Sequence, residues 1–139
     1  MRRTKDHLVS IGLLVLRLGA GALLLFGHGL PKLLHWTERA PRFANPIGLG
    51  PEVSFALVVF AEVVCAAAVL LGVATRVAAG PIVFFLLIGA FVQNSGGSFS
   101  DRELALVYLV PFIVLMLTGG GHYAFDTIIL RGRAGRRRL

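Results

Sequence analysis

Two ionisable side chains interrupt long apolar stretches of the chain. Arg17 lies in the run from Leu8 to Leu30, and Glu62 lies in the run from Val53 to Gly72. An ionisable group at the centre of a membrane-spanning helix costs about 2.5–3.5 kcal/mol on insertion scales, so such groups usually face a bundle interior and pair. We predict that Arg17 and Glu62 form a buried charge pair. Either the pair only fixes helix packing, or one of its members handles a proton or binds a polar substrate group. Exposure of the two side chains to lipid is the remaining alternative.

The predicted pairing depends on depth. Counted from the inner ends of the two apolar runs, Arg17 lies nine residues deep and Glu62 lies ten residues deep. A helix rises about 1.5 Å per residue, so the two depths nearly match.

A polar pocket is expected nearer the outer end of the same helices. His28 follows Arg17 by eleven residues, and eleven helical steps return to within about 20° of the same face. Lys32 comes next, Gln93 ends the third apolar run and Glu103 begins the fourth. We predict that His28, Lys32, Gln93 and Glu103 line this pocket. Two alternatives stay open: an ordinary interfacial histidine, and a lysine that extends toward lipid headgroups.

The remaining histidines and the cysteine do not form a metal or redox motif. A haem held by two histidines needs both at one depth on facing helices, but His28 and His35 are expected at the outer end and His7 and His122 at the inner end. The lone Cys65 excludes an intramolecular disulfide and any CxxC motif. We therefore expect no metal site. The residues identify neither a catalytic set nor a cofactor, and they leave open whether the chain is an enzyme.

The elements that must position these groups are membrane helices. Apolar residues make up 56% of the 139 residues and charged residues 15%, against about 45–50% and about 25% in soluble domains. A helix needs about 20 apolar residues to span a bilayer. The predicted spans are residues 8–30, 53–72, 77–93 and 103–118. The sequence thus predicts an all-α membrane protein, a four-transmembrane-helix bundle that forms a single domain over residues 1–139.

Charge placement predicts the orientation of the bundle. With the N-terminus inside, nine Lys and Arg residues flank the inner ends of the spans and four flank the outer ends. The positive-inside rule therefore favours an N-in/C-in topology, with residues 131–139 as a basic cytoplasmic tail. The net charge of +7 gathers at the two chain ends, which is typical of contact with anionic lipid and not of a nucleic-acid-binding face.

Two connecting segments carry further expectations. In the connection from Leu30 to Glu52, the rings of Trp36 and Phe43 are expected at the membrane interface. After the last span, Tyr123 to Leu130 is too short to cross and is expected to lie in the interface, with Asp126 as a helix N-cap.

Several short motifs occur in an order that resembles the DoxX family of small prokaryotic membrane proteins. They are Arg17-Leu18-Gly19, Gly27-His28-Gly29-Leu30-Pro31-Lys32, Glu62, Gly72-Val73-Ala74-Thr75-Arg76, Glu103 to Tyr108, and Gly119-Gly120-Gly121 followed by Asp126. The resemblance covers about Leu8 to Leu130 and implies a four-helix fold in the plasma (inner) membrane. The family is named for a membrane subunit associated with thiosulfate:quinone oxidoreductase. Other members associate with thiol or oxidative-stress enzymes, and distant relatives act as cargo receptors or assembly chaperones.

These observations lead to one functional hypothesis and two alternatives. The hypothesis is a small membrane subunit of a quinone-linked or thiol/sulfur oxidoreductase. It would hold a quinone or a partner in its outer half, with Arg17, Glu62, His28 and Glu103 along the polar path, because a quinone needs an apolar slot headed by one or two hydrogen-bonding groups. The alternatives are a non-catalytic scaffold or assembly factor, and a small-solute or proton pathway. The expected partners are the lipid bilayer and a membrane-associated oxidoreductase, and homo-oligomerisation is left open.

Overall fold

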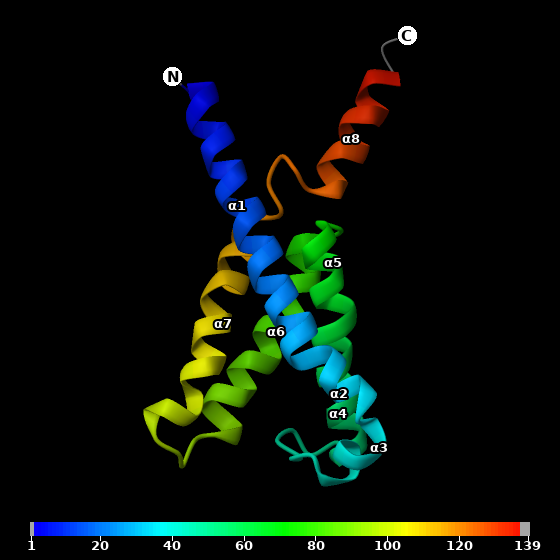
Figure 1. Cartoon of the computed structure of the whole chain (residues 1–139), viewed down its shortest axis with the longest axis vertical. Helices are drawn as coiled ribbons and strands as arrows, with labels where there is room; N and C mark the ends of the chain where they lie inside the picture. Colours follow the sequence, from blue (N-terminus) through cyan, green and yellow to red (C-terminus); the bar gives the residue numbers. More distant parts are fainter. Residues whose placement is uncertain (1, 137–139) are drawn as a thin grey trace.

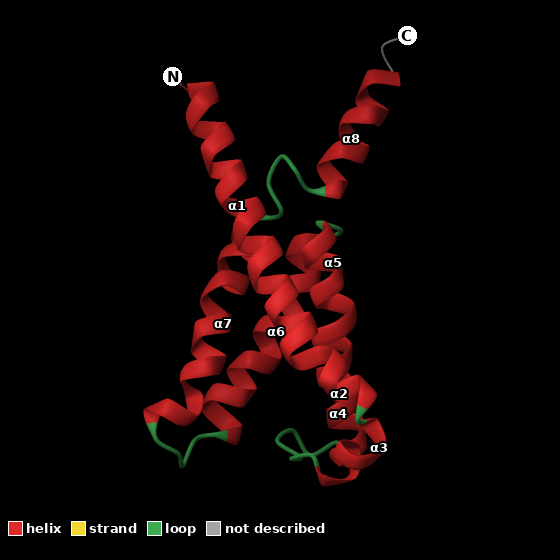
Figure 2. Ribbon diagram, viewed as in Figure 1, coloured by secondary structure: helices red, strands yellow, loops and turns green. Residues whose placement is uncertain are grey.

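The computed structural model describes residues 2–136, and every regular element within them is a helix (Figures 1 and 2). This confirms the predicted all-α class. Apolar stretches form the long helices, and glycine-containing segments separate rod 2 from rod 3, rod 3 from rod 4, and rod 4 from the last helix.

Four long helical rods make up the bundle. Rod 1 consists of α1 (Arg2–Leu24), the π-helical segment η1 (Leu25–Gly29) and α2 (Leu30–Leu34). Rod 2 consists of α4 (Pro51–Phe60), the π-helical segment η3 (Ala61–Cys65) and α5 (Ala66–Leu71). Rod 3 consists of α6 (Thr75–Ile88) and the π-helical segment η4 (Gly89–Gln93), and rod 4 is α7 (Phe99–Thr118). Between rods 1 and 2 lie α3 (Trp36–Arg39) and a 3-10 turn η2 (Ala40–Arg42), and α8 (Phe125–Arg136) follows rod 4. Each rod begins before the apolar run that predicted it.

Three of these rods have the length and composition of membrane spans. Within the described residues, the stretches Arg3–Leu34, Pro51–Leu71 and Thr75–Gln93 have mean hydropathies of 2.2, 2.5 and 2.0 over their best windows. The fourth rod has 20 residues but carries Asp101, Arg102 and Glu103 near its start. The chain is therefore built to lie in a lipid bilayer.

The rods run antiparallel in chain order, and the two ends of the molecule differ. Both chain termini lie at one end, which we call the termini end (Figure 1). The connections around α3 and between rods 3 and 4 lie at the other, which we call the loop end. At the termini end, the first part of α1 and the whole of α8 extend beyond the bundle as two separate arms (Figure 1).

Glycines set how rods 1 and 2 fit together. A Cβ atom built on Gly21 would lie 3.3 Å from the backbone of Leu70, and one built on Gly29 would collide with the carbonyl of Glu62. Backbones approach this closely in membrane bundles only where side chains are small. The shared core is completed by buried residues of all four rods, among them Leu24, Ala66, Val69, Ile82, Phe112 and Leu115.

The connection between rods 1 and 2 folds back onto rod 2. The rings of Trp36 and Phe43 each pack edge-on against Phe55, with ring centroids 5.1 and 5.2 Å apart. Phe55 also packs with Ala40 and Val59 in a small second core. The two aromatic rings expected at the interface thus hold this connection against the bundle.

The beginning of α8 is tied to the turn between α5 and α6. The turn itself is closed by Gly72, whose φ of 78° suits a residue without a side chain. The carboxylate of Asp126 accepts a hydrogen bond from the N–H of Ala74, and the Asp126 N–H donates to the Gly72 carbonyl at 3.2 Å. The predicted N-cap role of Asp126 is wrong, because Asp126 lies inside the first turn of α8 and bonds across to the turn between α5 and α6. The short interfacial segment is also longer than predicted and continues the helix to Arg136, while residues 137–139 of the basic tail lie outside the described residues.

Candidate ligand-binding site

Three of the four rods change from α-helix to π-helix where they meet. The π-helical segments are η1 in rod 1, η3 in rod 2 and η4 in rod 3. A π-helical turn accommodates an extra residue at a cost in hydrogen-bond geometry, and such turns occur frequently at functional sites. Three of them around one space distinguish this part of the bundle from the regular helices on either side.

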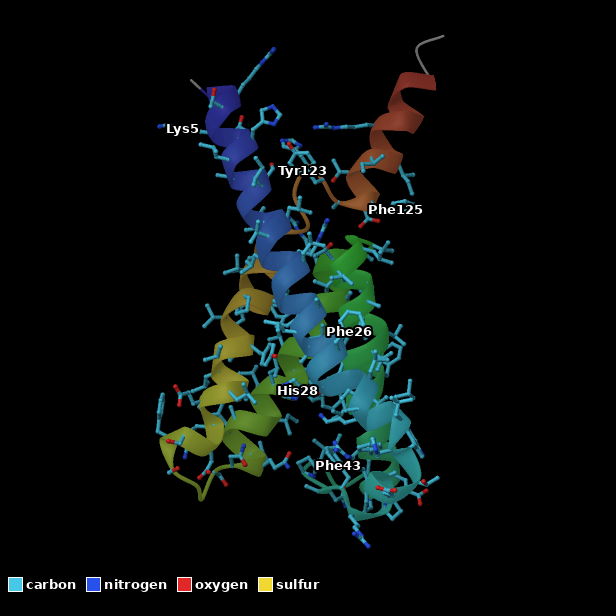
Figure 3. The ribbon with its side chains drawn as sticks, in the orientation of Figure 1. Lys5, Phe26, His28, Phe43, Tyr123 and Phe125 are labelled. Carbon is cyan, nitrogen blue, oxygen red and sulfur yellow. The ribbon has the colours of Figure 1, made fainter. Side chains whose placement is uncertain are left out.

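A cavity of about 310 Å³ lies between these segments and α7. η1 contributes His28, η3 contributes Ala61 and Glu62, and η4 contributes Gly89 and Gln93. The rest of the wall is mostly apolar and includes Leu24, Phe43, Ile82, Phe85, Leu86 and Leu104. Figure 3 marks His28 between rod 1 and the α6–α7 pair, and Phe43 nearer the loop end. An apolar cavity with a few convergent polar groups has the form of a small-molecule site, and its volume is at the small end of the usual range of about 300–1,000 Å³.

An ion pair forms one polar corner of the cavity. Lys32 Nζ lies 2.7 Å from each carboxylate oxygen of Glu62. Their side chains are only 20% and 14% exposed. The lysine comes from α2 and the glutamate from η3, so the pair also links rods 1 and 2. In an apolar surrounding, each charge depends on the other for its stability.

An aromatic pair forms a second polar corner. The ring of His28 meets the ring of Tyr108 edge-on, with centroids 5.3 Å apart and an interplanar angle of 86°. Both side chains are partly buried and line the cavity. Their ring nitrogens and hydroxyl group, together with the Lys32 ammonium, can donate hydrogen bonds to a carbonyl or similar acceptor.

The structure brings three of the four predicted pocket residues to this cavity. His28, Lys32 and Gln93 line it, whereas Glu103 is exposed and lies outside the lining. Glu103 directly precedes Leu104 and Ala105, which do reach the cavity wall. Glu62, predicted deeper in the membrane, is part of the cavity instead.

The predicted pair between Arg17 and Glu62 is wrong. Arg17 is buried, with 3% of its surface exposed, but it donates to the carbonyls of Gly120 at 3.3 Å and Tyr123 at 3.2 Å. The depth count failed because Glu62 packs beside Gly29. Twelve residues separate Gly29 from Arg17, which is about 18 Å along a helix.

Sequence reasoning also missed two features of the site. Tyr108 is not among the predicted pocket residues, although its position five residues after Glu103 places it farther along α7, where it lines the cavity. The π-helical segments were not expected at all. Gly29 and Gly89 stand at the boundaries of two of them, but glycines are common throughout this chain and carry no specific π-helical signal.

Comparison with known proteins identifies a family but no individual relative. The model of the DoxX family matches residues 12–95, which include rod 1 from residue 12 onward and the whole of rods 2 and 3. The cavity residues His28, Lys32, Glu62 and Gln93 all fall within this match. No curated protein and no solved structure matches the chain.

Proposed function

The chain belongs to the DoxX family, and we propose that its cavity binds the ring of a quinone for an oxidoreductase that associates with it in the membrane. The observation that carries this proposal is the convergence of three π-helical segments on one apolar cavity with two polar corners. The chain would serve as a small membrane subunit that holds the quinone, while electrons come from the partner enzyme.

The chemistry of a quinone fits the two corners of the cavity. A quinone has a flat apolar ring with two carbonyl oxygens, which accept hydrogen bonds. Tyr108 and His28 can donate to one carbonyl and Lys32 to the other, while the apolar wall holds the ring. Reduction of a quinone to a quinol takes up two electrons and two protons, and Glu62 and His28 are groups that can pass protons to the two oxygens.

The proposed setting is the plasma membrane of a prokaryote, with four crossings and both termini in the cytoplasm. Two observations support it. The termini lie at the same end of the molecule (Figure 1), and among the described residues seven Lys and Arg residues flank that end against four at the loop end. In this orientation α7 is the fourth crossing, with Asp101 and Glu103 in the outer interface, and the cavity lies in the outer half of the bilayer.

The proposal is tested by titrating purified protein in detergent with a short-chain quinone. Wild-type protein should bind it saturably. Tyr108→Phe removes one hydroxyl without changing the shape of the ring, and we expect it to weaken binding about tenfold. Tyr123→Phe is the matched control, because Tyr123 lies at the termini end, outside this cavity. Equal affinity in all three proteins, or no saturable binding, would refute a quinone site in this cavity.

A scaffold or assembly factor is the second candidate, and one observation favours it. Lys32 and Glu62 already satisfy each other at 2.7 Å, as expected of a pair that only fixes helix packing. This reading predicts no bound small molecule and no loss of partner association in Tyr108→Phe. A solute or proton pathway has less support, because the core between the cavity and Arg17 is formed by apolar residues such as Leu24, Val69 and Leu115.

A further inference from the structure

The two arms at the termini end form a second hollow, far from the cavity. It lies between the first part of α1 and α8, with a volume of about 510 Å³. α1 contributes Arg3, Asp6 and His7, the segment before α8 contributes His122 and Tyr123, and α8 contributes Ile128 and Arg131. The function proposed above makes no use of these groups.

The charge of this hollow favours an anion. Arg3 and Arg131 each carry one positive charge and Asp6 carries one negative charge, so the net charge is +1 before either histidine is protonated. The ring of His7 on α1 and the ring of His122 in the segment before α8 lie with their centroids 6.4 Å apart and are tilted by 46° to each other.

A hydrogen bond to a neighbouring histidine holds the guanidinium group of Arg131. Its Nη2 atom lies 2.8 Å from Nδ1 of His122, so the guanidinium donates to the histidine ring and is fixed in direction. The other guanidinium N–H groups remain able to donate, and a guanidinium matches a phosphate through two parallel hydrogen bonds. When Nδ1 accepts from Arg131, the ring carries its own proton on Nε2 and can donate as well.

Apolar side chains border the charged groups on both arms. Leu8 and Val9 on α1 are 64% and 63% exposed, and Ile128 on α8 is 59% exposed. Tyr123 and Phe125 are also exposed (Figure 3). In a membrane protein this combination suits the headgroup region, where acyl chains cover apolar side chains and phosphates meet basic ones.

From this arrangement we infer that the hollow between α1 and α8 binds the phosphate headgroup of an anionic phospholipid. Arg131, Arg3 and the two histidines donate to the phosphate. The acyl chains lie against Leu8, Val9 and Ile128. Asp6 faces the same hollow and disfavours headgroups that present a second phosphate close to it. This site is independent of the quinone proposal, because it shares no residue with the cavity.

The inference is tested by the lipid that the protein retains. Wild-type protein is placed in nanodiscs of phosphatidylcholine with one part in five phosphatidylglycerol, then released into mild detergent for native mass spectrometry. We expect retained phosphatidylglycerol in preference to phosphatidylcholine. Arg131→Gln should lower its occupancy about fivefold, and adding Arg3→Gln should lower it further by a similar factor.

The matched control is Arg39→Gln, which removes the same charge from an exposed arginine at the loop end. It should keep the wild-type preference, and Arg131→Lys should keep part of it. Melting temperatures of all variants show whether they remain folded. Equal lipid retention in Arg131→Gln and Arg39→Gln would overturn the inference. Binding of millimolar inorganic phosphate by wild type, together with no preference for phosphatidylglycerol over phosphatidylcholine, would also overturn it, by showing a site for free phosphate and not for a phospholipid.

Discussion

Lys32 and Glu62 show how a charged residue can be kept inside an apolar bundle. Each is mostly covered, and each has the other at hydrogen-bonding distance. Removing one partner of a fully buried pair costs about 3–5 kcal/mol, whereas replacing both by apolar residues of similar volume is often neutral. Because this pair is partly exposed, we expect the cost of removing one partner to lie below that range.

We therefore expect strong coupling between the two positions. Lys32→Met alone and Glu62→Leu alone should each lower the free energy of unfolding by about 2 kcal/mol, because each leaves an uncompensated charge. The double variant should recover most of this loss. Unfolding in detergent, monitored by circular dichroism, gives the unfolding free energies of the three variants, which together form a double-mutant cycle. Additive losses in the double variant would show that the two groups do not stabilise each other.

Arg17 has a different role from Glu62 and should behave independently of it. Its guanidinium holds the carbonyls of Gly120 and Tyr123, so Arg17→Leu leaves those carbonyls unpaired and α8 less firmly attached. We expect faster amide hydrogen exchange in residues 119–125 and no change in exchange around Glu62. Because the two sites lie apart, the effects of Arg17→Leu and Glu62→Gln on stability should add. Strong coupling between the two substitutions would instead support the predicted Arg17–Glu62 pair and contradict the structure.

At the residue scale, the sequence identifies important groups better than it identifies their partners. Arg17, His28, Lys32 and Glu62 attract attention because they are ionisable residues within or beside apolar runs. Their partners depend on the register between rods 1 and 2, which is set where Gly29 meets the backbone of Glu62. Counting from the ends of apolar runs misjudges that register, because rod 1 continues well beyond its apolar run.

At the scale of elements, the π-helical segments are what open the cavity. η1 places His28 in the wall of the cavity, and Lys32, one helical turn later in α2, bonds to Glu62. Deleting Gly27 should return η1 to a regular α-helix and rotate the following residues by about 100°. We expect the deletion variant to remain helical but to lose quinone binding by at least tenfold in the titration described above.

Gly27→Ala provides the control for this deletion, because it keeps the length of the chain. A Cβ atom at Gly27 meets nothing within 4 Å, so the substitution should leave both folding and binding unchanged. If the deletion binds quinone as well as Gly27→Ala does, the π-helical segment is not needed for the site.

The long elements could be predicted from sequence, and their details could not. Apolar runs indicate where helices exist, since about 20 such residues are needed to cross a bilayer. They do not indicate where helices begin. α7 starts at Phe99 because Ser98 and Asp101 form a capping box, four residues before the predicted start. The short helices between rods 1 and 2 depend on the packing of Trp36 and Phe43 against Phe55, which no local pattern reveals.

At the scale of the whole molecule, the proposed topology places the loop end outside the cell and the termini end in the cytoplasm. In a Cys65→Ala background, Ser95→Cys introduces a thiol at the loop end and Thr4→Cys introduces one at the termini end. Both positions are exposed. In intact cells, a membrane-impermeant thiol reagent should label Ser95→Cys at once and Thr4→Cys only after permeabilisation. Labelling of Thr4→Cys in intact cells would reverse the proposed topology.

The two proposed binding sites lie toward opposite ends of the molecule. The cavity lies toward the loop end, where Lys32, Gln93 and Phe43 form part of its wall. The basic hollow lies at the termini end between the two arms. Arg17 stands between these regions and fixes the segment that connects α7 to α8. A ligand in the cavity and a lipid between the arms can therefore be bound and tested separately.

The central claim is that the cavity at the three π-helical segments holds a small molecule in the cell. Native mass spectrometry of protein extracted from its own membranes in mild detergent tests it most directly, using wild type, Glu62→Gln and Glu103→Gln. Glu103→Gln makes the same chemical change outside the cavity wall. We predict a bound species of quinone mass on wild type and Glu103→Gln, and its loss from Glu62→Gln. The same occupancy in all three proteins, or none in any of them, would contradict the account.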